Sequence, residues 1–73
     1  MLLLSDETAE LTDITERIQR KFRGRVQEFR LDTAQEGLIL YGFTRTYYEK
    51  QLVQQAVLCS TERPIAANEI VVG

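Results

Sequence analysis

The stretch Leu38-Ile39-Leu40-Tyr41-Gly42-Phe43 is apolar at nearly every position. Continuous apolarity over a short run is typical of a strand that is buried on both faces, or buried on one face and adhesive on the other. Side chains alternate across a strand, so if Leu38 and Leu40 face the core, then Ile39, Tyr41 and Phe43 face the opposite side. The stretch therefore predicts a strand with an apolar outer face.

The residues before this strand predict its partner in a hairpin. Phe29 and Leu31 alternate with Glu28, Arg30 and Asp32, which is the pattern of a half-buried strand. Residues 33–37 form a five-residue connection, within the usual range for hairpins. The two strands are therefore expected to pair antiparallel.

The residues after the strand predict a helix over 47–60. Thr46 and Glu49 have the spacing of a capping box at its start, and Pro64 cannot continue it. The stripe of this helix that is expected to be buried consists of Tyr48, Leu52, Ala56 and Cys59, flanked by Val53 and Val57. Cys59 is expected to be a free thiol.

A last strand is expected over 66–72, with Ile70 and Val72 on one side and Glu69 on the other. Asn68 falls on the side of Ile70, where its amide is expected to satisfy backbone groups at a strand end.

A first helix is predicted over 11–23, because Leu11, Ile14, Ile18 and Phe22 recur at intervals of three and four. Asp13 and Glu16 resemble a capping box near its start, Ser5 with Asp6 and Glu7 gives an earlier possible start, and Gly24 is the expected stop. Residues 1–10 are expected to form a flexible or helical extension of a domain that covers 11–73.

The predicted order is α-β-β-α-β, an α+β fold. A strand-helix-strand unit crosses over right-handedly, so the last strand should lie parallel to Leu38–Phe43. Two helices then cover one face of a mixed three-stranded sheet.

Composition argues against a self-contained enzyme. The chain has 73 residues, one cysteine and no histidine, which excludes a histidine-based triad, a histidine-containing zinc site and an internal disulfide. No catalytic residue, metal site or cofactor is therefore expected. No signal peptide or membrane-spanning run is visible, which predicts a cytoplasmic location, or a periplasmic one if the chain is a fragment of an exported protein.

The net charge of −2 is the sum of opposed blocks: residues 1–16 carry acids only, and residues 17–30 carry six bases against Glu28. Acids near the start of a helix and bases near its end complement the helix dipole. The alternative is that the bases contact a phosphate or lipid headgroup, and these candidate anion contacts are Arg17, Arg20, Lys21, Arg23 and Arg25.

The ordered set of motifs resembles the BON family, named for bacterial osmotic-stress and nodulation proteins. The resemblance covers about Leu11 to Val72, and its Tyr-Tyr-x-x-Gln-Leu variant looks like the single-domain members of planctomycete-type bacteria. It rests on Gly37–Gly42, Tyr47-Tyr48, Gln51-Leu52, Ala56-Val57 and Ala67–Val72. It implies an αββαβ fold without catalysis that associates with phospholipid membranes or with other proteins.

We therefore expect a non-catalytic binding or oligomerisation module that acts through protein–protein contacts, with self-association or a protein partner. The expected contact surface is the open sheet face, formed by Ile39, Tyr41, Phe43 and Val71. Tyr47 and Tyr48 are expected to place one ring in the core and one at the rim, or to join Phe43 and Arg45 in a small ligand-contacting surface.

Two alternatives stay open. The first is a peripheral phospholipid-binding module that uses the bases named above. The second, ranked lower, is a small nucleic-acid-binding domain. The chain lacks the Gly-x-x-Gly clamp of a KH domain and the βαββαβ order of an RRM.

Overall fold

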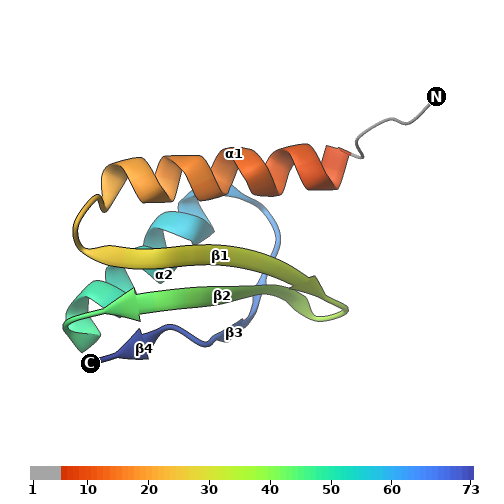
Figure 1. The fold of residues 1–73 in the computed structure, drawn as a ribbon. Helices are drawn as coiled ribbons and strands as arrows, with labels where there is room; N and C mark the ends of the chain where they lie inside the picture. Colours follow the sequence, from red (N-terminus) through yellow and green to blue (C-terminus); the bar gives the residue numbers. More distant parts are fainter. Residues whose placement is uncertain (1–5) are drawn as a thin grey trace.

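The central strand of the sheet is β2 (Gly37–Thr44), which pairs with every other strand. The computed structural model describes residues 6–73. Two helices, α1 (Asp6–Lys21) and α2 (Tyr47–Ser60), pack with the sheet (Figure 1). The other strands are β1 (Val26–Ala34), β3 (Ile65–Asn68) and β4 (Val71–Val72). The predicted α+β class and the order of helices and strands are confirmed.

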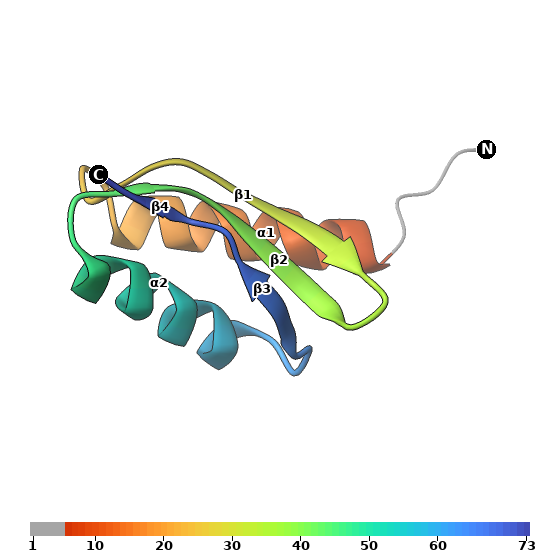
Figure 2. The same ribbon diagram turned by 90° about the horizontal axis from the view of Figure 1, so that it is seen from below.

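The pairing of the strands also follows the prediction. β1 pairs with β2 antiparallel, whereas β3 and β4 both pair with β2 parallel. α2 supplies the crossover between the parallel strands and covers one face of the sheet (Figure 2). The sheet is therefore mixed, with β2 in the middle.

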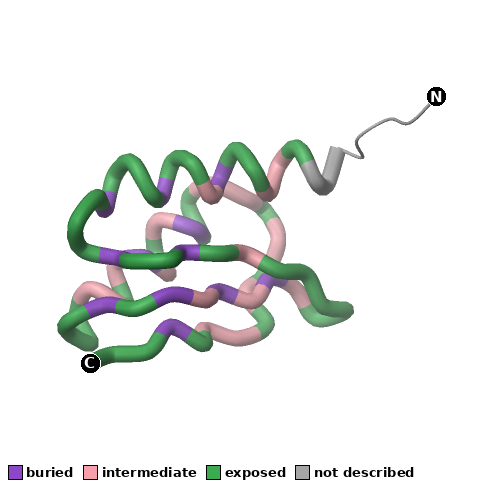
Figure 3. Tube along the Cα trace, viewed as in Figure 1, coloured by how far each residue is buried: buried purple, intermediate pink, exposed green. Residues whose placement is uncertain are grey.

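The core lies between the two helices and the face of the sheet that they cover. Burial alternates along β2, where Leu38, Leu40, Gly42 and Thr44 are buried and the residues between them are not (Figure 3). Leu38 and Leu40 are fully buried, as predicted. The helices contribute Ile14, Ile18, Phe22, Val53 and Val57 to the same core.

α1 begins earlier and ends earlier than predicted. Residues 6–10 are helical, whereas residues 1–5 of the predicted extension lie outside the described residues. Asp13 and Glu16 therefore sit inside the helix, so the predicted capping box is wrong. Instead, an Asp13 carboxylate oxygen lies 3.2 Å from Nε of Arg17, one turn along the helix. Gly24 follows in the left-handed region, with φ of 80°.

β1 extends beyond the predicted residues at both ends, and it contains a β-bulge. The register shifts between Gln27 and Arg30, and Glu28 has a φ of 54°. The extra residue brings both Val26 and Phe29 to the core side, although three positions separate them. The hairpin is also tighter than the predicted five-residue connection, since Ala34 pairs with Gly37.

The connection from α2 to β3 packs directly on Gly37. The amide of Leu38 donates a hydrogen bond of 2.9 Å to the carbonyl oxygen of Pro64. Gly37 has a φ of 143°, and a Cβ built on it would clash with that same oxygen. The absence of a side chain at Gly37 is therefore what allows the loop to lie against the start of β2.

The predicted last strand is divided into β3 and β4. Ile70 lies between them with its side chain in the core, 2% exposed, whereas Glu69 is exposed, so the two residues lie on opposite sides as predicted. Its amide donates to Oδ1 of Asn68 at 3.1 Å, and the Asn68 amide group donates to Oε1 of Gln54 on α2 at 2.9 Å. Asn68 thus satisfies a backbone group at a strand end, as predicted, and also ties the strand to α2.

α2 has its predicted bounds but not its predicted rotation. The Thr46 hydroxyl accepts from the Glu49 amide at 3.1 Å, and the Glu49 carboxylate accepts from the Arg45 amide, which confirms the cap. Val53 and Val57 are fully buried, whereas Cys59 is exposed, so its predicted burial is wrong. α2 is apolar on two adjacent stripes, and the valine stripe faces the sheet.

Candidate interaction surfaces

The open face of the sheet carries a continuous apolar strip along β2. Ile39 pairs with Ala67 and Phe43 pairs with Val71, and Tyr41 lies between these pairs. Phe43 is 47% exposed and Val71 is 52% exposed, while Ile39 and Tyr41 are half-buried. The structure thus brings the four predicted contact residues together on one face. We call the set Ile39, Tyr41, Phe43 and Val71 the sheet strip.

Charged side chains of opposite sign flank the sheet strip. On the β1 side, the Arg30 guanidinium lies over the Tyr41 ring, 4.7 Å from its centroid. This distance is within the range of a cation–π contact. On the opposite side, exposed Glu69 follows Ala67 and Asn68 and donates its amide to the Leu40 carbonyl oxygen at 2.8 Å. The strip is therefore apolar along its length. Its β1 flank carries a base, Arg30 opposite Tyr41, and an exposed acid, Asp32 opposite Ile39, and its other flank carries Glu69.

A hollow of about 400 Å³ adjoins the end of the sheet strip. Phe43 and Arg45 line it from the end of β2 and the residue after it, and Gly24, Arg25, Gln27 and Glu28 line it from the opposite side. Phe43 and Arg45 therefore share one hollow, but neither Tyr47 nor Tyr48, which were expected to join them, lines it. The sequence did not reveal the hollow, because the bulge at Glu28 that shapes one of its walls has no glycine to signal it.

The prediction that one of the two tyrosine rings lies in the core is wrong. Tyr47 is 63% exposed and Tyr48 is 70% exposed, so neither ring is in the core. Tyr47 lines a separate hollow with Lys50, Gln54 and Asn68, away from the hollow beside Phe43. Both residues lie in the first turn of α2, where the buried stripe of valines has not yet begun.

The five predicted anion contacts do not form one patch. Three of them, Arg17, Lys21 and Arg25, line a groove of about 480 Å³ between α1 and α2. Arg20 and Arg23 line a different hollow together with Glu16 and Gln19. The bases of α1 and of the turn after it are therefore divided between two hollows.

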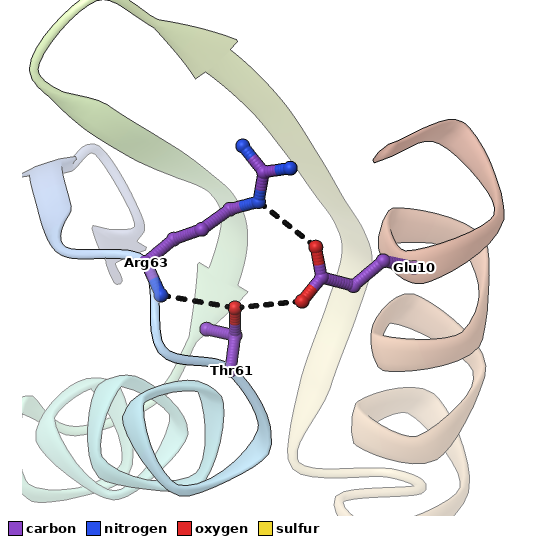
Figure 4. A network of polar contacts seen from close by, with 3 residues as sticks. All are labelled: Glu10, Thr61 and Arg63. Atoms are coloured by element: carbon purple, nitrogen blue, oxygen red, sulfur yellow. Dashed lines mark hydrogen bonds and ion pairs between the residues drawn. The ribbon is translucent and has the colours of Figure 1, made fainter. Parts of the chain in front are cut away.

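A polar network that the sequence did not reveal joins α1 to the loop after α2 (Figure 4). The two Glu10 carboxylate oxygens accept from the Thr61 hydroxyl at 3.0 Å and from Nε of Arg63 at 2.8 Å. The Arg63 amide also donates to the Thr61 hydroxyl oxygen at 3.1 Å. Glu10 is more than fifty positions from Thr61 and from Arg63, so no local pattern could indicate its contact with them.

The Glu10 network predicts a stability difference that depends on pH. The hydrogen bonds from Arg63 and then Thr61 lower the pKa of the Glu10 carboxyl in the folded protein. A lowered pKa adds stability that is present above the unfolded pKa and is lost as pH falls through the folded value. We expect Glu10→Gln to lower the free energy of unfolding at pH 7, and this difference to shrink as the pH falls below about 4.3, the ordinary pKa of glutamate, and through the lowered pKa of the folded protein.

Urea denaturation at several pH values measures this difference. Glu62→Gln is the matched control, because it removes an exposed carboxylate from the same loop. A Glu10→Gln defect of the same size at pH 3 and pH 7 would show that packing, rather than charge, is responsible.

No helix within residues 6–73 is long and apolar enough to span a membrane. The same part of the chain gathers no group of three or more cysteine, aspartate or glutamate side chains that could hold a metal ion. A comparison with models of known protein families finds no match, and comparisons with curated proteins and with solved structures find none at the level of significance applied. Function must therefore be argued from the surfaces described above.

Proposed function

We propose that this chain is a non-catalytic oligomerisation module of the BON type, which associates with a second copy of itself through the sheet strip. The observation that carries the proposal is the continuous apolar strip on the open sheet face, with Phe43 and Val71 about half exposed and paired with each other. Contiguous exposed apolar surface marks contact sites in small soluble domains.

The flanking charges favour a second copy as the partner. Two sheets that pack face to face about a two-fold axis along the strands place the β1 flank of one copy opposite the β3 flank of the other. This arrangement brings Arg30 of each copy toward Glu69 of the other and stacks the apolar strips between them. The Arg30 and Glu69 side chains thus supply one pair of opposite charges on each side of the two-fold axis.

Association also supplements a small core. A domain of this size buries only about 60% of the surface of its unfolded chain, so its stability is marginal. Each apolar Å² removed from water adds roughly 25 cal/mol. Covering Phe43 and Val71 is therefore expected to raise the stability of the folded chain as protein concentration rises.

Sedimentation equilibrium tests the proposal on variants of the sheet strip and of the charged residues beside it. We expect the wild-type chain to form dimers with a Kd below about 100 μM, and Phe43→Lys or Tyr41→Lys to raise this Kd more than about tenfold. Gln51→Lys, which adds the same charge to an exposed position of α2, is the matched control. Arg30→Glu is expected to weaken the dimer, and Glu69→Arg in the same chain to restore it.

Two results would contradict the proposal. One is a chain that stays monomeric at about 1 mM, well above the expected Kd. The other is a dimer that Phe43→Lys and Gln51→Lys affect equally, which would place the contact elsewhere.

The exposed bases of α1 favour a second candidate, a peripheral phospholipid-binding module. Arg17, Lys21 and Arg25 lie beside an apolar groove, an arrangement that suits an anionic headgroup above acyl chains. Co-sedimentation with phosphatidylglycerol vesicles and with phosphatidylcholine vesicles distinguishes the two candidates. The oligomerisation module stays in the supernatant with both, whereas a lipid binder sediments with the anionic vesicles.

A further inference from the structure

The groove between α1 and α2 is a surface that the sheet strip does not use. Its lining comes from the second half of each helix and from Arg25 in the turn after α1. Ile18 and Phe22 belong to the buried core and form its floor, and Leu52 and Ala56 pack partly buried against that core. Cys59 also lines it and is exposed. The stripe of α2 that does not face the sheet thus forms an apolar wall of this groove.

The charged residues that line the groove are all basic and lie on its α1 side. Arg17, Lys21 and Arg25 are spaced four residues apart on the α1 side. The α2 side contributes the uncharged polar residues Gln55 and Ser60, and no acidic residue lines the groove. Arg17 pairs with Asp13, one turn earlier on α1. Lys21 and Arg25 therefore leave a positive rim beside the apolar floor.

The dimensions of the groove suit a short helix. On α2 the lining residues run from Leu52 to Ser60, which spans about 12 Å at 1.5 Å per residue. This length corresponds to about two turns of an α-helix. Sites for small ligands bury most of the ligand surface, whereas this groove is open to solvent between α1 and α2. An amphipathic helix laid into an apolar groove is a recurring mode of peptide recognition.

We infer that this groove binds a short amphipathic helix of another protein, with an apolar stripe for the floor and acidic residues along the flank that faces Lys21 and Arg25. A second copy of this chain does not supply such a helix from its described residues. The apolar face of α1 is buried in its own core, and α2 contains a single acidic residue, Glu49. The inference is independent of the proposed function, because the groove and the sheet strip share no residue.

The chain offers a direct binding assay, because it contains no tryptophan. The probe is a designed helical peptide of about four turns, with leucines at positions i, i+3, i+4 and i+7, one tryptophan in that stripe and glutamates along one flank. The control peptide carries lysines in place of the glutamates. We expect the tryptophan emission of the acidic peptide to shift to the blue with a Kd below about 1 mM, and this Kd to rise with salt.

Variants of the rim locate the contact. Lys21→Glu and Arg25→Glu are each expected to raise the Kd of the acidic peptide about tenfold or more. Arg20→Glu is the matched control, since it makes the same charge change on α1 but lines the other hollow. Bound acidic peptide should also slow alkylation of the exposed Cys59 thiol, which lies within the groove. Phe43→Lys should leave both readouts unchanged.

Three outcomes would overturn the inference. The first is the absence of a shift with the acidic peptide up to about 1 mM. The second is equal binding of the acidic and basic peptides, or equal effects of Lys21→Glu and Arg20→Glu. The third is binding to phosphatidylglycerol vesicles through Lys21 and Arg25 without binding to the peptide, which would assign the rim to a membrane surface. Each of these outcomes leaves the dimer of the sheet strip untouched.

Discussion

Gly37→Ala is expected to destabilise the domain by about 3 kcal/mol or more. A Cβ at this position would clash with the Pro64 carbonyl oxygen and lie 2.8 Å from the Pro64 carbonyl carbon. Both atoms belong to backbone, so relief of the clash requires the loop to move away from β2. That movement would break the hydrogen bond from the Leu38 amide to the Pro64 oxygen. The φ of 143° adds strain for any residue with a side chain.

Thermal and urea denaturation measure this effect, and Gly24→Ala is its control. Gly24 also has a positive φ, of 80°, but a Cβ there would meet no heavy atom within 4 Å. Its replacement therefore isolates backbone strain and is expected to cost about 1 kcal/mol. In a domain of this size, each kcal/mol corresponds to a change in Tm of about 4–8 °C. Equal losses in the two variants would show that the contact with Pro64 is not tight.

Leu40→Ala is expected to cost about 3 kcal/mol, the second large effect. Leu40 is fully buried at the centre of β2, where the two helices and the sheet meet. Truncation removes apolar contacts and leaves a cavity that elements on three sides cannot readily fill. Because the total stability of a 73-residue domain is only about 4–11 kcal/mol, this loss is a large part of it.

The control for Leu40→Ala is Leu58→Ala. Leu58 is on α2 and is 39% exposed, so its truncation leaves no cavity, and we expect a cost below about 1 kcal/mol. Urea denaturation with a constant m-value reports the difference between the two variants. A Leu40→Ala variant as stable as Leu58→Ala would mean that β2 is not the centre of the core.

The elements that the sequence predicts correctly carry local signals of their type or of their ends. α2 begins after Thr46 and ends before Pro64, and both residues act through local geometry that the sequence displays. β2 was predicted because its apolar run is unbroken, and its alternation followed from the geometry of any strand. The parallel pairing of the last strand followed from the handedness of the crossover. The four residues of the sheet strip could therefore be placed on one face in advance.

The elements that were predicted poorly depend on contacts between distant residues. The bulge at Glu28 needs a left-handed conformation that glycine or asparagine would have signalled and glutamate does not. The rotation of α2 was ambiguous, because the stripe with Cys59 and the stripe with Val53 are both apolar. Packing against the sheet selected the valines, and the other stripe became a wall of the groove. The contact of Glu10 with Arg63 likewise exists only in the folded chain.

Because both helices cover the same face of the sheet, a dimer formed through the opposite face would present two binding sites. A dimer formed through the sheet strips would bury the strips and keep both helix grooves accessible, one on each subunit. A partner with two acidic helices on a linker of suitable length would then bind both grooves, and its second contact would be intramolecular. The overall affinity for such a partner would exceed the affinity of either groove alone, and this gain would disappear in the Phe43→Lys monomer.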